Sequence, residues 1–248
     1  MIVLLPPSET KRAGGDGPPL SLDELSSPAL GPLRAWLVGD LVALAADRPA
    51  CRGALGLSAK QDGEIERNAM LLYSPTLPAI NRYTGVLYDA LDIESLSRVA
   101  ASRARARLAI GSALFGLLRA DDMVPAYRLS ATSKLPGRPT LTARWKPVLE
   151  PELARLAADE LIVDLRSGSY AALGKVPGAV EVDVLAEHQD GRRTVVSHFN
   201  KAHKGRLARA LASTRAEPDG AASVAAIARR AGMRVERNGN ELTVVVPA

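Results

Sequence analysis

The sequence predicts a single α+β domain that spans residues 1–248. Apolar runs typical of buried strands lie at Ile2–Leu5 and Leu161–Leu165, and leucines at helical spacing lie between residues 30 and 44. Hairpin signals stand at Asp190-Gly191 and Asn238-Gly239. No internal repeat, low-complexity tract or long linker divides the chain. We therefore expect a mixed β-sheet with hairpins, surrounded by helices, with a positively charged cleft.

The first half of the chain contains one predicted strand and three predicted helices. The strand is Ile2–Leu5, and two prolines end it. The first helix is predicted to begin with Ser27 as its N-cap and Pro28 in its first turn, and its leucines at 30, 33, 37, 41 and 44 form one face. A second, short helix is predicted from the start signal Ser74-Pro75. A third is predicted from a cap at Asp92 to about Ala106, with apolar residues 93, 96, 99 and 100 on one face.

The second half is richer in strand patterns. Residues 180–184 alternate valine with acidic residues, which is typical of a half-exposed strand, and the turn after it predicts a returning strand at Thr194–Phe199. Helices are predicted over Lys201–Ala212 and Ala221–Ala231, the second one stopped by Gly232. The chain closes with a predicted hairpin of Arg234–Arg237 and Leu242–Val246.

The charge balance permits binding to phosphate groups. Lys and Arg number 32 against 27 Asp and Glu, so the net charge is +5, and only seven of the cations are Lys. Arginine suits bidentate contacts to phosphate. The same composition also fits a GC-rich genome, which favours Arg and Ala codons. A net charge of this size permits nucleic-acid binding without demanding it.

The composition also indicates where the protein acts. Cys51 is the one cysteine, so no internal disulfide and no all-cysteine metal site can form. The N-terminus lacks the pattern of a signal peptide, and no stretch approaches the length of a membrane span. We expect a cytoplasmic protein without a membrane partner.

A cluster of basic residues lies at 198–206, where a predicted strand ends and a predicted helix begins. Cations at a helix N-terminus oppose the helix dipole, and a bound anion would remove that conflict. The alternative is a merely solvated basic turn. The three histidines, at 188, 198 and 203, lack the spacing of ligands on one helix face, so no metal site is predicted and no cofactor is indicated.

Two further segments carry candidate functional residues. Arg119 and Arg128 follow apolar segments that can hold them rigidly, although local salt bridges to Asp121 or Asp122 would explain them equally well. The polar residues after the strand at 161–165 lie where α/β sheets often carry active sites, although Ser-Gly-Ser is also simply a good loop. In that segment Asp164 is a candidate base, and Ser167 and Tyr170 are candidate hydrogen-bonding groups.

Separate segments resemble one family in the right order along nearly the whole chain. Lys11 matches the lysine of the family's opening Ser-Pro-Ala-Lys-Thr, and residues 114–129 follow its LYGVLRPLD…PYRL pattern. Further matches are Trp145, then Leu165, Ser167 and Tyr170, then Ser197, Lys201, Lys204, Gly205 and Arg209. The chain therefore resembles the YaaA family of peroxide-stress-resistance proteins, as an actinobacterial-looking member. The resemblance implies a single α+β domain with a positively charged cleft, DNA binding, and a role in limiting iron-driven oxidative damage to DNA.

The chain departs from the family pattern in two places. The family's Lys-Gly-Asp-Val-Tyr reads here as residues 84–88, Thr-Gly-Val-Leu-Tyr, which lacks both the Lys and the Asp. Its helix-hairpin-helix region falls at Ala54–Asn68, where this chain is shortened. These departures weigh against duplex binding through that element.

The resemblance and the charge together lead to a first functional hypothesis, sequence-independent DNA binding in a cleft. Its phosphate contacts would come from cations on separate segments, and such a grip weakens steeply with salt. Tyrosines 83, 88 and 127 are the candidate platforms for stacking bases. The candidate phosphate-binding residues are Lys11, Arg119, Arg128, Lys201, Lys204 and Arg209.

The second hypothesis is an enzyme that acts on a small anionic substrate, such as a nucleotide or a phosphorylated metabolite, in the same cleft. Active sites need particular residue types at particular points, and a lysine with a lowered pKa serves as a base or a nucleophile. The candidate catalytic residues are Lys11, Ser167, Tyr170 and Lys201.

Overall fold

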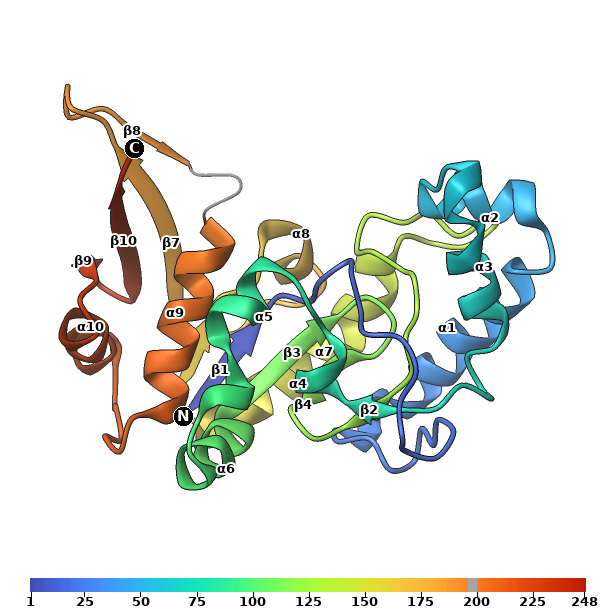
Figure 1. Ribbon diagram of the computed structural model, residues 1–248, viewed down its shortest axis with the longest axis horizontal. Helices are drawn as coiled ribbons and strands as arrows, with labels where there is room; N and C mark the ends of the chain where they lie inside the picture. The colour runs from blue at the N-terminus through green and yellow to red at the C-terminus, as the bar shows by residue number, and fades with distance from the viewer. Residues whose placement is uncertain (196–199) are drawn as a thin grey trace.

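The computed structural model describes residues 1–195 and 200–248 (Figure 1). Within these residues, eight strands form one mixed sheet in the order β4-β3-β1-β6-β7-β10-β9, and β8 pairs with β7. The fold is α+β, as predicted. The strands of this sheet are β1 Ile2–Leu5, β3 Leu108–Ser112, β4 Gly116–Arg119, β6 Ile162–Asp164, β7 Val180–Glu187, β8 Arg193–Val195, β9 Arg234–Asn238 and β10 Glu241–Pro247.

Five adjacent strands of the sheet are parallel, in the order β3-β1-β6-β7-β10. Val3 of β1 lies opposite Leu108 of β3 on one side and Val163 of β6 on the other. All four residues of β1 are buried, because both faces of the strand are covered, and this explains the uninterrupted apolar run. The strands predicted at Ile2–Leu5 and Leu161–Leu165 are confirmed.

The C-terminal part of the sheet contains the two hairpin turns that the sequence predicts, at Gly191 and Gly239. In β7 the residues from 180 to 184 are alternately buried and exposed, as predicted. Gly239 has φ +58° in the turn between β9 and β10, and Gly191 has φ +80° in the turn before β8, so both turns need a residue that adopts left-handed backbone angles. Residues 196–199 of the strand predicted at Thr194–Phe199 lie outside the described residues.

Four of the five predicted helices are present. In the first half of the chain, the residues predicted to cap them do not act as side-chain caps. The leucine stripe lies on η1 Pro28–Leu30 and α1 Gly31–Leu44, but Ser27 is not a side-chain cap, because its φ is +58° and its side chain accepts no cap hydrogen bond. The other confirmed helices are α6 Arg98–Arg107, α9 Asn200–Ser213 and α10 Ala221–Arg230.

Two predicted helix starts are wrong. No helix begins at Ser74, because the chain there leads into the short strand β2 Leu77–Pro78, which pairs with β5 Met123–Val124, and α4 Ala79–Arg82 follows. Asp92 ends α5 Val86–Leu91 in the left-handed region instead of beginning a long helix. After η3 Ile93–Ser95, the side chain of Ser97 accepts from the Ala100 amide and caps α6.

The remaining helices lie in the parts of the chain that had no assignment from the sequence. The longest, α7 Leu141–Asp159, contains two prolines and buries Trp145 and Leu149 against the core. The others are α2 Arg48–Leu55, η2 Ala59–Gln61, α3 Asp62–Ala69 and α8 Gly168–Ala171.

Helix α9 lies beside β7 and α5 (Figure 1). Gly205 allows this close crossing, because a Cβ atom at that position would stand 2.2 Å from the main-chain oxygen of Leu87 in α5. The first turns of α9 thereby approach the carboxyl end of β6, where Lys204 contacts the main chain. The crossing thus places the predicted basic segment at one edge of the sheet.

Candidate functional site

The candidate site lies at the carboxyl edge of the central parallel strands. Strands β1, β3 and β6 run in the same direction, so their carboxyl ends meet at one edge, where open α/β sheets bind ligands. The segment that leaves β1 crosses this edge and carries Glu9 and Lys11. We define the Lys11 cluster as Glu9, Lys11, Tyr83, Tyr127, Arg128 and Tyr170.

Lys11 is held by its own segment and by two aromatic rings. Its Nζ donates to the main-chain oxygens of Ser8, at 3.0 Å, and Glu9, at 3.5 Å. The same atom lies 4.2 Å from the ring centroid of Tyr127 and 5.3 Å from that of Tyr83. Ring faces attract the ammonium form, but removal of water costs it more, and burial lowers the pKa of Lys11 to about 7.

The tyrosines beneath Lys11 form a buried hydrogen-bonded chain. The hydroxyl of Tyr127 lies 2.8 Å from that of Tyr83 and 2.7 Å from Oγ of Ser112. The Tyr88 hydroxyl donates to the main-chain oxygen of Pro6 at 2.9 Å. Burial raises the pKa of Tyr83 to about 12 and raises the pKa of Tyr127 well above its ordinary value, so both phenols keep their protons. These tyrosines lie in the core, so the prediction that they stack on bases is wrong.

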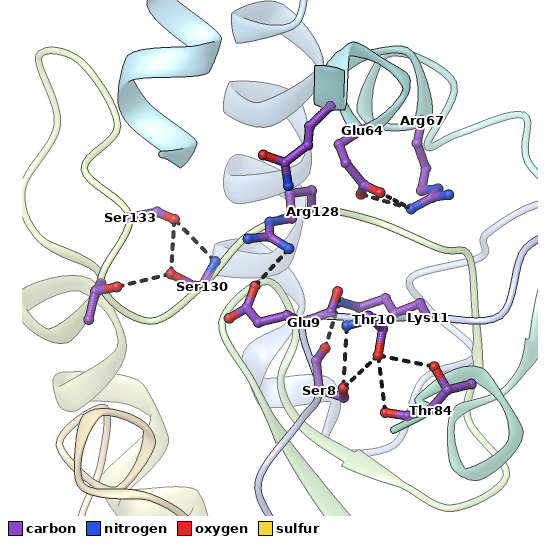
Figure 2. A network of polar contacts seen from close by, with 12 residues as sticks. Ser8, Glu9, Thr10, Lys11, Glu64, Arg67, Thr84, Arg128, Ser130 and Ser133 are labelled. Carbon is purple, nitrogen blue, oxygen red and sulfur yellow. Dashed lines mark hydrogen bonds and ion pairs between the residues drawn. The ribbon is translucent and has the colours of Figure 1, made fainter. Parts of the chain in front are cut away.

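Arg128 and Glu9 supply the charges next to Lys11. Nη1 of Arg128 lies 3.2 Å from Oε2 of Glu9, and the two side chains point toward one another in Figure 2. The backbone of Arg128 is fixed independently, because its N–H donates to the Asn68 side chain and its carbonyl accepts from it. A local salt bridge to Asp121 or Asp122 was the alternative role for this arginine. In the structure its ion-pair partner is Glu9 instead.

Tyr170 completes the cluster from α8. Burial raises the pKa of its phenol, and the neighbouring Glu9 carboxylate acts in the same direction. Ser167, the residue before α8, is exposed and makes no side-chain cap hydrogen bond. The Asp164 carboxylate, considered as a base, accepts from the guanidinium of Arg166 at 2.8 Å in a buried pair, so it is engaged structurally.

Lys201 and Lys204 lie at the same edge of the sheet, but Lys201 is exposed and Lys204 is buried. Lys201 is exposed in the first turn of α9. The buried Nζ of Lys204 donates to the main-chain oxygens of Leu165, at 3.1 Å, and Arg166, at 3.4 Å. Burial lowers the pKa of Lys204, while Asp183 and Asp164 act in the opposite direction. Lys204 therefore satisfies carbonyls at the end of β6, which explains a cation so near a helix start.

The other two predicted phosphate-binding residues lie away from the Lys11 cluster. Arg119 pairs with Ala109 at the opposite edge of the sheet, and its side chain donates to the main-chain oxygen of Ala106. Arg209 lies about two turns along α9 from Lys201 and donates to the main-chain oxygen of Leu91, at the end of α5, and to the side chain of Ser95 in η3. The fold therefore brings Lys11 and Arg128 together and leaves Arg119 and Arg209 outside this group.

The two described histidines lie along a separate groove between α9 and β10, with a volume of about 790 Å³. His188 lies there 2.9 Å from the hydroxyl of Thr194, and burial lowers the pKa of His203, with Arg206 acting in the same direction. His198 lies outside the described residues. Among the described residues, no group of three or more His, Cys, Asp or Glu side chains is placed to hold a metal ion.

The region expected to resemble a helix-hairpin-helix forms two helices, α2 and α3. Gly56 ends α2 with φ +63°, and Ser58 with Gln61 caps the turn between the helices. The first turn of α3 carries Asp62, which accepts from both Arg48 and Arg52, and Glu64. These carboxylates already occupy the helix N-terminus, so the end of α3 does not attract a phosphate.

Comparisons with known proteins identify similar sequences along nearly the whole chain. A family model described as peroxide stress protein YaaA matches residues 1–232. The chain is 51% identical to a UPF0246 protein of Corynebacterium efficiens over 253 aligned residues, which cover 99% of this chain and 100% of that protein. It is 45% identical to a UPF0246 protein of Streptomyces coelicolor over 240 residues, covering 95% and 92% of the two chains. No helix in the described part of the chain has the length and apolar character to cross a membrane.

Proposed function

We propose that this chain, which belongs to the YaaA family of peroxide stress proteins, acts in the cytoplasm on a small anionic substrate bound at the Lys11 cluster. The observation that carries the proposal is the position of Lys11, whose Nζ lies over the rings of Tyr127 and Tyr83 next to the ion pair of Arg128 with Glu9. Burial there lowers the pKa of the amine to about 7. Strongly perturbed groups of this kind gather at functional sites. A partly exposed arginine beside such an amine suits recognition of a carboxylate or phosphate.

The distribution of cations favours a small ligand over a long phosphate backbone. Lys204 and Arg209 already donate to main-chain oxygens of the protein, and Arg119 is at the opposite edge of the sheet. A strand or duplex needs several cations along one path, because each phosphate contact contributes separately to affinity. Lys11 and Arg128 instead both contact Glu9, Lys11 at its main-chain oxygen and Arg128 at its carboxylate. The guanidinium of Arg128 makes its one described ion pair with Glu9, whose side chain is 46% exposed and can be displaced by an anion.

Binding of anions to purified protein tests this proposal. We expect inorganic phosphate, nucleoside monophosphates or small carboxylates to bind in isothermal titration, with at least one dissociation constant below about 1 mM. Arg128→Gln should weaken that binding by roughly 10- to 100-fold, because hydrogen bonds to charged groups contribute about 1.5–3 kcal/mol. Arg12→Gln is the matched control, since Arg12 is on the same segment but pairs with Glu94 instead. If the parent protein, Arg128→Gln and Arg12→Gln all bind these anions equally well, the proposal that Arg128 binds the anion is wrong.

DNA binding is the second candidate, and it is favoured by exposed cations outside the Lys11 cluster. Lys201 is exposed at the start of α9, and Lys60 is exposed in the turn between α2 and α3. The chain carries a net charge of +5, which attracts nucleic acid without regard to sequence. In this second candidate the protein limits iron-driven oxidative damage by covering DNA.

Fluorescence anisotropy with labelled duplex across a salt series tests DNA binding. We expect log affinity to fall linearly with log salt, and the slope should become shallower by about 1 in Lys201→Ala if that residue contacts a phosphate. Arg209→Ala serves as a contrast, because its guanidinium is engaged with α5. A duplex affinity that does not respond to salt, or no affinity at all, would rule out this candidate.

A further inference from the structure

We infer that Lys11 is a nucleophile that forms an imine with the carbonyl group of a substrate that also carries an anionic group, and that Arg128 binds this anionic group. The inference rests on the proposed function, since it assigns the substrate class and the reaction of the same site. The candidate substrates are 2-oxo acids and phosphorylated aldehydes, which combine a carbonyl with a carboxylate or a phosphate.

The hydrogen bonds of Nζ match a neutral amine. A neutral lysine has two N–H groups and one lone pair, whereas the ammonium form has three N–H groups. Two acceptors are present, the main-chain oxygens of Ser8 and Glu9. Among the described residues, no carboxylate lies within salt-bridge distance of Nζ. These two acceptors are enough for both hydrogens of the neutral amine, the form whose lone pair can react with a carbonyl group.

The surroundings of the amine favour its neutral form relative to an ordinary lysine. The rings of Tyr83 and Tyr127 exclude water from one side of Nζ. Burial lowers the pKa most, the Glu9 carboxylate opposes it, and the Arg128 guanidinium acts in the same direction as burial. Lys11 as a whole is still half-buried rather than enclosed, so a small molecule can reach it.

The same residues place the two ends of the substrate. The guanidinium of Arg128 has donors beyond the one used by Glu9, and a planar carboxylate or phosphate matches its fork. Glu9 links the two cations, because its main-chain oxygen accepts from Nζ of Lys11 at 3.5 Å and its carboxylate lies 3.2 Å from Nη1 of Arg128. The two side chains therefore lie on either side of one residue, within the span of a small molecule with two functional groups.

The reaction is a condensation that needs no oxidant or reductant. The lone pair of Nζ attacks the carbonyl carbon, a C–N bond forms, and the carbonyl oxygen takes up a proton to give a carbinolamine. The C–O bond then breaks, and the oxygen leaves as water with both hydrogens that the amine supplied. The product is an imine between Lys11 and the substrate carbon, and hydrolysis reverses it.

Reductive trapping tests the inference. The full-length protein is incubated at pH 7 with pyruvate, glyoxylate or pyridoxal 5′-phosphate and then with sodium cyanoborohydride, and peptide mass spectrometry locates the adduct. We expect Lys11 to carry at least 10-fold more adduct than any of the other six lysines. The yield should fall at least 10-fold in Arg128→Gln and stay unchanged in Arg12→Gln. Lys11→Met and Lys11→Arg, checked for folding by thermal unfolding, should give no adduct at this position.

Two outcomes separate the failure of this inference from that of the proposed function. If these anions bind with an affinity that depends on Arg128, but reduction leaves Lys11 unmodified, the imine is refuted and the binding site stands. If Lys11 reacts equally well with propanal and with the oxo acids, and no anion binds, the anion site and the substrate class inferred here are both refuted.

Discussion

Replacing Arg82 by methionine is expected to lower the free energy of unfolding by at least about 3 kcal/mol and to disorganise the segment that carries Lys11. Arg82 is completely buried, and its guanidinium donates to four main-chain oxygens. The acceptors lie on three separate parts of the chain, namely Val124, then Arg12 and Gly14, and then Pro75.

The size of this effect follows from what the substitution leaves behind. Methionine fills much of the volume but donates nothing, so four carbonyls lose their partner in a place with little water. A buried unsatisfied group costs about 1–3 kcal/mol, and some relaxation of the chain reduces the sum. Arg12 and Gly14 lie directly after Lys11, so the loss falls on the segment that holds the amine over the tyrosine rings.

Urea unfolding measures the loss, with two comparisons. Arg82→Lys keeps the charge but cannot reach all the acceptors, so it should be nearly as destabilising as methionine. Arg12→Gln removes an exposed ion pair with Glu94 and should change stability by no more than about 1 kcal/mol. If the free energy of unfolding of Arg82→Met lies within about 1 kcal/mol of that of the parent protein, the hydrogen bonds of Arg82 do not hold this segment in place.

The parts of the fold with strong local patterns were predictable from the sequence. The apolar run of β1, the alternation in β7 and the glycine turns of the two hairpins each depend on residues within a few positions of one another. Helix α7 was missed because Pro147 and Pro151 interrupt it, and local rules end a helix at such residues. Burial of Trp145 and Leu149 stabilises that helix in spite of its prolines, and packing of that kind depends on distant parts of the chain.

The candidate site was predictable only in part. Lys11 and Arg128 were identified from their positions in motifs and do lie together. The roles of Lys204, Arg119 and Arg209 could not be read from the sequence, because each donates to main-chain oxygens that only the folded chain brings near. Glu9 and Arg82 were missed for the same reason, since nothing local distinguishes them from ordinary surface charges.

Lys11 should titrate about three and a half pH units below an ordinary lysine, and this is the second large effect that we expect. Its pKa is lowered from 10.5 to about 7 because burial removes water from the ammonium form. In competitive acetylation, the rate at Lys11 should therefore reach half its plateau near pH 7. Nα-acetyl-lysine in the same tube should do so near its ordinary pKa of about 10.4.

The neighbours of Lys11 give the sign of two further shifts in this titration. The Glu9 carboxylate raises the pKa of Lys11, so Glu9→Gln should move the midpoint to lower pH. The Arg128 guanidinium lowers it, so Arg128→Gln should move the midpoint to higher pH. Opposite movements in the two variants cannot result from a general loosening of the segment, which would move both toward the value of an exposed lysine.

Stability must follow the same titration. Between about pH 7 and 10.5 the unfolded chain binds a proton at Lys11 that the folded chain does not, so the free energy of unfolding gains a term that rises with pH. The full term is on the order of 5 kcal/mol, and below about pH 7 it is lost because both states are protonated. Lys11→Met removes it, so the free energy of unfolding of the parent protein minus that of the variant should rise as pH rises through this window. A difference that stays constant across the window, together with an acetylation midpoint above pH 9, would mean that Lys11 is an ordinary ammonium group.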